Sequence, residues 1–159
     1  MSTRSVIAAR TKRGFKGVYH HWDGYPSGLG AELFRLYRSR FKKDLTAMMQ
    51  ELIKKHPAGW SSIFNEECYC HKNGNSSEKA LAVTEKNASG SGCEYAYILE
   101  EGPDGDQMVI LSSYCNPKSK YAGQKMIGAF GYGDDKGIWK PIATVLLNGK
   151  EPKWENIKA

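Results

Sequence analysis

Short apolar runs near the N-terminus follow the pattern expected of paired β-strands. Residues 4–11 contain the run Val6-Ile7-Ala8-Ala9, and residues 15–22 provide a second extended segment. The intervening Lys12-Arg13-Gly14 reads as a turn, because glycine adopts positive φ without steric cost. The pattern therefore predicts an N-terminal β-hairpin.

Between residues 29 and 55 the apolar spacing changes to threes and fours, which predicts a central helical block. The positions that share this spacing are Leu33, Phe34, Tyr37, Phe41, Leu45, Met48, Met49 and Leu52. Asp44 belongs to the residue types favoured at helix N-caps, so a break near residues 39–43 and a second helix after it are also considered. The His56-Pro57-Ala58-Gly59 segment is expected to end the block.

Strand patterns return in the second half of the chain. Residues 94–100 and 107–113 flank Gly102-Pro103-Asp104-Gly105, a strong hairpin signal, and residues 138–147 form a last expected strand. Most of residues 72–92 read as loop, with a short strand near residues 80–84. Strands around one helical block predict an α+β fold with a mainly antiparallel sheet, in a single domain of residues 1–159.

The densest chemistry lies between the hairpin and the helical block, where residues 20–30 read HHWDGYPSGLG. Imidazoles, an indole, a carboxylate and a phenol suit a polar or phosphorylated ligand, or the handling of a proton. A three-residue turn centred on Arg13 would place Thr3 opposite Asp23 and Ser5 opposite His21. In that register Arg4, His20 and Trp22 share the other face, and a shift of one residue would swap the faces.

The glycines at the start of the helical block suggest a second element of the site. Backbone amides at a helix N-terminus can hold an anion, so Ser27, Gly28 and Gly30 are expected to form a cradle. The full set of expected ligand-binding residues is Thr3, Arg4, Ser5, His20, His21, Trp22, Asp23, Tyr25, Ser27, Gly28 and Gly30. The alternative is purely structural: Trp22 in the core, a turn at Asp23-Gly24, and Ser27 as an N-cap.

Positive charge is concentrated in the first third of the chain. Residues 1–56 hold 12 Lys and Arg against 4 Asp and Glu, a net charge of +8, and the remainder holds 11 against 13, a net of −2. Such a surplus attracts anions. It also allows a nucleic-acid interface made by Arg35, Arg38, Arg40, Lys42 and Lys43. The plainer alternative is that these residues solvate a helix face.

The four cysteines are expected to be reduced thiols. No apolar run approaches a signal peptide or the roughly 18 residues of a membrane span, so we expect a cytoplasmic protein without a membrane partner. Cys68 and Cys70 would share one strand face, which Cys93 and Cys115 could approach, with His71 on the opposite face. Because paired C-x-x-C knuckles are absent, we expect no metal, and no cofactor is indicated.

Two N-terminal segments carry a family resemblance. TRSVIA at residues 3–8 and YHHWDGYPSGLG at residues 19–30 resemble a family of small uncharacterised bacteriophage and prophage proteins. ECYCH at residues 67–71 and GCEYAY at residues 92–97 are similar to further segments of that family. The resemblance implies a phage-type origin and action inside an infected bacterium, and it implies no catalytic residue.

Three function classes remain. The favoured one is a phage-type accessory protein that binds a small anionic, nucleotide-like ligand at the TRS and HHWDGYPSGLG segments and acts against a host pathway. The second is a hydrolase or transferase acting on a nucleotide, with His21 as general base, oriented by Asp23 or helped by Ser5. The third is a module that binds a host protein or nucleic acid, and the sequence leaves open a homo-oligomer.

Overall fold

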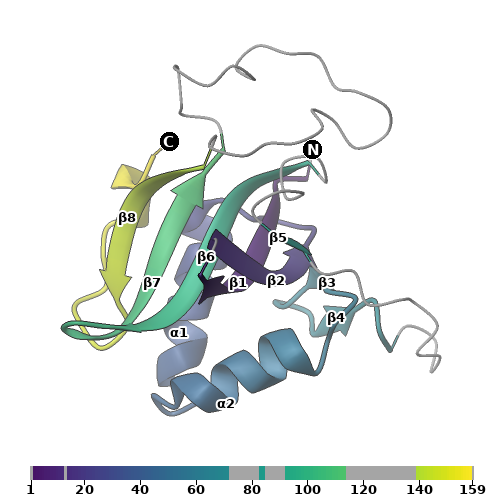
Figure 1. Ribbon diagram of the computed structural model, residues 1–159, viewed down its shortest axis with the longest axis horizontal. Coiled ribbons are helices and arrows are strands. Elements are labelled where there is room, and N and C mark those ends of the chain that lie inside the picture. The colour runs from purple at the N-terminus through teal and green to yellow at the C-terminus, as the bar shows by residue number, and fades with distance from the viewer. Residues whose placement is uncertain (1, 13, 72–82, 85–91, 114–138, 159) are drawn as a thin grey trace.

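The computed structural model describes residues 2–12, 14–71, 83–84, 92–113 and 139–158. Within them the chain adopts an α+β fold, in which eight strands form one sheet (Figure 1). The strand order is β4-β3-β2-β1-β6-β7-β8, and β5 pairs with β2 beside this path. The predicted fold class is therefore confirmed.

The N-terminal hairpin forms between β1 (Arg4–Thr11) and β2 (Gly14–His20), but in a different register from the expected one. Thr11 pairs with Gly14 and Ser5 pairs with His20. Only two residues separate the strands, so every pair shifts by one residue relative to a three-residue turn. The prediction that Ser5 lies opposite His21 is wrong, and the strand faces are swapped.

The centre of the sheet brings distant segments together. β1 pairs in parallel with β6 (Cys93–Gly102), and β2 pairs in parallel with β3 (Trp60–Ser62). The other ladders are antiparallel, including the hairpin of β6 with β7 (Gly105–Ser112) that the Gly-Pro-Asp-Gly signal predicts. The remaining strands are β4 (Glu67–Cys68), β5 (Val83–Thr84) and β8 (Lys140–Leu146).

The helical block is interrupted. It consists of a π-helical turn η1 (Pro26–Gly30), α1 (Ala31–Arg38), α2 (Leu45–Met49) and a second π-helical turn η2 (Gln50–Lys54). The Asp44 side chain accepts a hydrogen bond of 3.0 Å from the Ala47 amide and so caps α2. The alternative with a break before Asp44 is therefore confirmed.

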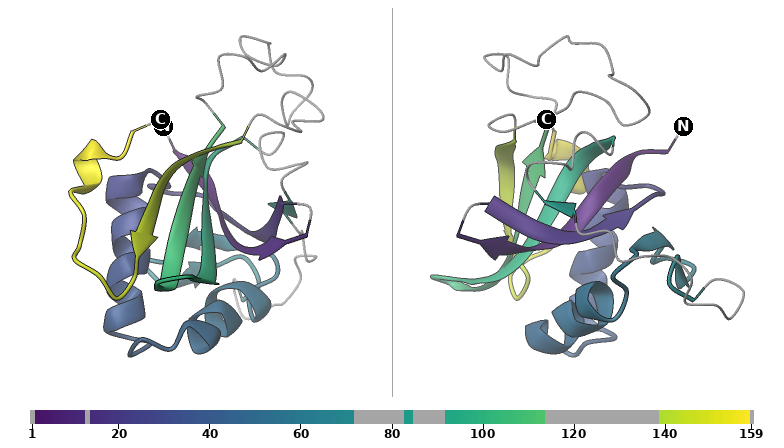
Figure 2. Two further views of the ribbon diagram at one scale, coloured as in Figure 1. Left: turned by 60° about the vertical axis from the view of Figure 1, so that its left-hand side comes forward. Right: turned by 45° about the vertical axis from the view of Figure 1, so that its right-hand side comes forward.

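Apolar side chains cover both faces of the sheet. The helices lie on one face (Figures 1 and 2), where Ile7, Tyr97 and Ile110 belong to the larger core cluster. The C-terminal 3-10 turn η4 (Trp154–Asn156) adds Trp154 to that cluster. Val6, Phe15 and Trp139 belong to a second cluster, on the opposite face. In the described parts of the chain, every helix is too short or too polar to span a bilayer.

Candidate functional site

The observed register sorts the predicted site residues onto two faces of the β1–β2 hairpin. Arg4, Tyr19 and His21 gather on the face away from the helices, where Tyr19 packs against the second core cluster. Ser5 and His20 point to the helical face and are both fully buried. The polar segments thus meet as predicted, but in different combinations.

Arg4, Tyr19 and His21 form a short hydrogen-bonded chain. The Tyr19 hydroxyl lies 2.6 Å from His21 Nδ1, and the Arg4 side chain hydrogen-bonds to that hydroxyl. Burial raises the pKa of Tyr19 to about 12, although the Arg4 charge opposes this shift. Burial, followed by the positive charge of Arg4, lowers the pKa of His21. Near neutral pH this hydrogen-bonded chain therefore has the neutral imidazole of His21 at one end and the Arg4 cation at the other.

Tyr19 was not among the ligand-binding residues predicted from the sequence, although it contacts His21. Tyr19 directly precedes the HHWDG segment, and residues two apart in a strand share a face. Pairing Tyr19 with His21 by that alternation would have found it. Gly92 lies beside Arg4. Its φ is +80°, a conformation that favours glycine, and a Cβ there would lie 2.8 Å from Arg4 Nη1.

Trp22 projects beside this chain instead of entering the core. Its side chain is 47% exposed and makes an edge-to-face contact with the His21 ring, with centroids 4.6 Å apart. The Trp22 amide donates to the Ser61 carbonyl at 3.1 Å, which anchors its backbone next to β3. The structural alternative that places Trp22 in the core is therefore wrong.

Asp23 and Tyr25 pair with each other. Asp23 has a φ of +54°, and its Oδ1 accepts a hydrogen bond of 3.3 Å from the exposed Tyr25 hydroxyl. His21 Nδ1 instead contacts Tyr19. The orienting carboxylate expected for a His21 base is thus engaged elsewhere, and Ser5 lies on the opposite face of the hairpin. The structure does not form the proposed catalytic pair.

Ser5 and His20 form a buried polar pair across the hairpin. His20 Nε2 accepts a hydrogen bond of 3.1 Å from the Ile63 amide, and burial lowers the His20 pKa to about 3. Ser5 Oγ and His20 Nδ1 are buried without a hydrogen-bond partner among the described atoms. A Cβ on Gly24 would lie 2.5 Å from Ser5 Oγ, so Gly24 closes over this pair. Ser5 and His20 therefore support the hairpin from its helical face, opposite Arg4 and His21.

At the helix mouth, where an anion cradle was expected, two backbone amides are engaged within the chain. The Gly28 amide donates to the Tyr25 carbonyl, and the Leu29 amide donates to the Asp23 carbonyl, both at 2.9 Å. Gly30 is buried, and a Cβ there would lie 3.2 Å from both Tyr97 and Trp154. Ser27 is exposed, and no side chain caps η1. Gly28 and Gly30 allow close packing, because a Cβ at either position would crowd neighbouring atoms. The amides of Gly28 and Leu29 already donate hydrogen bonds within the chain.

Thr3 contributes through its backbone. Its carbonyl accepts a hydrogen bond of 2.8 Å from the Gly24 amide, which ties the loop after β2 to the start of β1. The predicted proximity of the TRS and WDG segments therefore holds through this bond, although the side-chain pairs differ.

The basic residues of the helical block are largely used within the molecule. Arg35 pairs with Glu151, and Arg40 pairs with Glu51 and Glu66. Arg38 donates to the Leu147 and Gly149 carbonyls and lies over the Phe34 ring. Lys42 and Lys43 are exposed, in the loop before α2. The five residues thus provide fewer available cations than the sequence suggests.

The cysteines separate instead of gathering. Cys93 is buried with its Sγ 3.5 Å from the Ser5 carbonyl, and strands β3, β2 and β1 lie between β6 and β4. Cys70 is buried and accepts a hydrogen bond from the Ala58 amide, and Cys115 lies outside the described residues. Cys68 Sγ lies 3.1 Å from His71 Nδ1, so the expectation that His71 points away from Cys68 is wrong. β4 ends at Cys68, and strand alternation does not extend to residue 71.

Comparison of the chain with protein-family models, with curated proteins and with solved structures finds no match. The resemblance of residues 3–30 to phage proteins therefore stays a prediction. The function has to be inferred from the side chains that the fold brings together.

Proposed function

We propose that this protein binds a small anionic, nucleotide-like ligand on the surface formed by Arg4, Tyr19, His21 and Trp22, which we call the Arg4 surface. The observation that carries the proposal is the half-buried Arg4 guanidinium at one end of the hydrogen-bonded chain. Arg4 takes part in none of the ion pairs found among the described residues. No carboxylate in the described part of the chain neutralises its charge, which supports its use in binding an anion.

The hydrogen-bond directions favour an anion over a cation. Arginine is always a donor, so the Tyr19 oxygen accepts from Arg4, and we assign the Tyr19 hydroxyl proton to the bond with His21 Nδ1. A neutral imidazole that accepts at Nδ1 carries its proton at Nε2. Arg4 and His21 thus offer N–H donors, which match phosphate oxygens. The exposed Trp22 indole offers an apolar plate suited to stacking on a base.

The setting of the proposal follows from the sequence. The resemblance of residues 3–30 to phage proteins supports a phage-encoded accessory role in the host cytoplasm, where sequestering a host nucleotide would act against a host pathway. The pairing of Asp23 with Tyr25 disfavours the enzyme alternative, because His21 lacks its expected carboxylate. The ion pairs of Arg35 and Arg40 disfavour a nucleic-acid interface on the helical block.

The first test is native mass spectrometry of freshly purified protein, followed by denaturing extraction of any retained molecule. A panel of ribonucleoside mono-, di- and triphosphates is then titrated, with binding followed by calorimetry and tryptophan fluorescence. We expect saturable binding that falls at least about tenfold in Arg4→Gln, since a charged hydrogen bond contributes roughly 1.5–3 kcal/mol. Arg10→Gln is the matched control, because Arg10 lies on the same strand but pairs with Glu100.

A second variant pair separates stacking from charge. Trp22→Ala is expected to weaken binding of these nucleotides, and Phe64→Ala, which removes another exposed aromatic ring, is expected to leave it unchanged. Absence of a retained molecule together with no binding across the panel would overturn the proposal. Equal binding by Arg4→Gln and the unmodified protein would also overturn it. Conversion of a bound nucleotide during incubation would instead support the enzyme alternative.

A further inference from the structure

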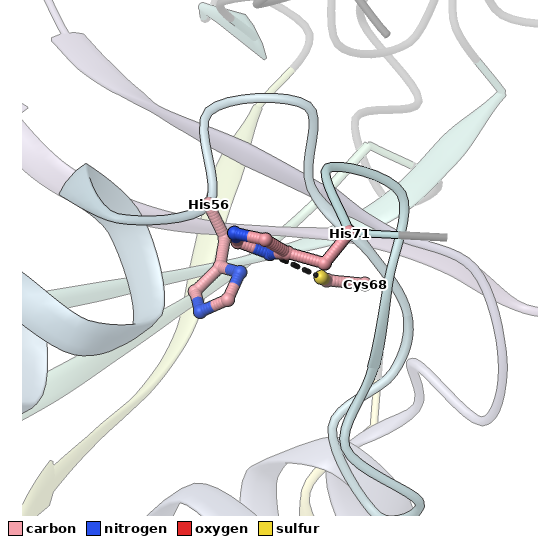
Figure 3. A group of neighbouring side chains, drawn as sticks. All are labelled: His56, Cys68 and His71. Atoms are coloured by element: carbon pink, nitrogen blue, oxygen red, sulfur yellow. Dashed lines mark hydrogen bonds between the residues drawn. The ribbon is translucent and has the colours of Figure 1, made fainter. Parts of the chain in front are cut away.

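A second cluster of reactive side chains lies at the β4 edge of the sheet. His56 follows η2, Cys68 ends β4, and His71 follows shortly after it. One nitrogen or sulfur atom from each lies within 4.8 Å of the corresponding atoms of the other two. Figure 3 shows the three side chains converging from separate segments. None of them takes part in the Arg4 surface.

The hydrogen bonding of His56 is incomplete in a specific way. Its Nε2 lies 3.5 Å from a Glu51 carboxylate oxygen, whereas its Nδ1 is buried and has no hydrogen-bond partner among the described atoms. In Figure 3 one ring nitrogen of His56 faces the other two side chains and the second points away from them. An acceptor nitrogen that faces a thiol and a second imidazole, with its ring held by a carboxylate, is the usual arrangement of a metal-binding histidine.

The donor set indicates which ion would fit. Two imidazoles and one thiolate are borderline-soft ligands, which suit Zn²⁺ and disfavour Mg²⁺ or Ca²⁺. Ligand atoms around tetrahedral zinc lie about 3.5 Å apart, given bond lengths of about 2.0–2.3 Å. The Cys68 Sγ to His71 Nδ1 distance of 3.1 Å is close to this value, and the His56 ligand atom lies within 4.8 Å of both.

We propose that His56, Cys68 and His71 bind one Zn²⁺ ion, with Glu51 positioning His56 from the outer shell. The fourth tetrahedral position is left to water or to an external ligand. The ion would join the segment after η2 to the segment around β4, and so add to the hydrogen bonds from the Tyr69 amide to the Gly59 carbonyl and from the Ala58 amide to Cys70 Sγ. Sequence spacing conceals this site, because its ligands are an H-x11-C-x2-H set instead of paired C-x-x-C knuckles.

The test uses the full chain, stripped with a chelator and titrated with Zn²⁺ or Co²⁺ alone. We expect one equivalent of either ion per chain, a thiolate-to-cobalt charge-transfer band in the near ultraviolet, and a higher unfolding temperature with zinc. Zinc should also protect Cys68 from iodoacetamide, with the modified residue identified by peptide mapping. Glu51→Gln should weaken zinc binding by roughly 10- to 100-fold, as outer-shell changes do.

Variants locate the ion. Cys68→Ser should abolish the charge-transfer band. His71→Ala should weaken zinc binding more than Glu51→Gln does, because it removes a direct ligand of the ion. His71 is exposed, so its removal leaves the core intact. Cys93→Ala is the matched thiol control, because three strands separate β6, which carries Cys93, from β4, and this variant should bind zinc normally. Circular dichroism of each variant checks that the fold is retained. Lack of saturable zinc binding, or a band that survives in Cys68→Ser, would overturn the proposal.

Discussion

At the scale of single residues, His20 is a titratable side chain enclosed in the folded protein. It is completely buried on the helical face of β2, and it is held neutral because burial, and then the nearby His21, lower its pKa to about 3. In the unfolded chain a histidine has its ordinary pKa of 6.5. The folded protein therefore binds fewer protons than the unfolded chain between these two values.

Stability is accordingly predicted to fall as the pH is lowered. The unfolded state gains the proton first, so the free energy of unfolding decreases from about pH 6.5 towards pH 3. The loss should be on the order of 1 kcal/mol per pH unit in the middle of that range. Urea unfolding at pH 7, 6 and 5 measures it. His20→Gln, which stays neutral at every pH, should have a flatter profile, and parallel profiles for the two proteins would contradict the assignment to His20.

The chemistry of the site residues was predictable from their types, but their partners were not. HHWDG identifies a polar segment whatever the register, whereas the placement of Arg4 on the same face as Tyr19 and His21 depends on a turn of two residues instead of three. A single residue of turn length decides which side chains share a face, and Lys12-Arg13-Gly14 does not specify it. The Cys68–His71 contact escaped for a similar reason, because β4 ends earlier than the alternating pattern implies.

At the scale of elements, the helical block depends on local signals. α2 contains only five residues, and the described contacts at its start include the Asp44 cap on the Ala47 amide. Short helices gain little from propensity alone and rely on capping and packing. Buried Leu45 and Met48 supply the packing on the sheet side.

Removal of the α2 cap should therefore be measurable. Asp44→Ala is expected to lower the free energy of unfolding by about 1 kcal/mol, because the Ala47 amide loses its acceptor. Asp44→Asn retains a side-chain oxygen and should lose only a few tenths of that amount. Urea denaturation at neutral pH compares the three proteins. An Asp44→Ala midpoint equal to that of the unmodified protein would show that packing alone maintains α2.

Element existence was easier to predict than element boundaries. The apolar run in β1 and the Gly-Pro-Asp-Gly turn between β6 and β7 are strong local patterns, and both are confirmed. The π-helical turns η1 and η2 were not predicted, since their apolar spacing differs little from that of an α-helix. The parallel pairing of β1 with β6 has no local signal, because it joins segments almost ninety residues apart in the sequence.

At the scale of the whole molecule, the C-terminal segment packs against the beginning of the helical block. Trp154 is buried and lies edge-on to the Phe34 ring, with ring centroids 5.8 Å apart. Its ring also packs against Gly30, where a Cβ would lie 3.2 Å from the indole. Arg38 adds hydrogen bonds to the carbonyls of Leu147 and Gly149 on the approach to this turn. The Trp154 side chain thus packs the C-terminal segment against the larger core cluster.

Trp154→Ala is predicted to destabilise the protein by about 3–5 kcal/mol, the range found for large-to-small changes at buried aromatic positions. Trp22→Ala removes an indole that is 47% exposed and should cost much less. Thermal and urea unfolding of both variants provide the comparison. Equal losses for the two variants would indicate that the C-terminal segment contributes little to the core.

The central position of β1 in the sheet affects the order in which strands pair as the chain folds during synthesis. The N-terminal hairpin can close as soon as residues 4–20 are available, yet the other edge of β1 stays unpaired until residues 93–98 have been made. Val6 and Ala8 lie on this strand, so the nascent chain carries an apolar edge open to wrong pairing. Arg4, at the start of that edge, acquires its Gly92 neighbour only when β6 docks. The surroundings of the Arg4 surface are therefore completed late in folding, although the hairpin that carries this surface can form early.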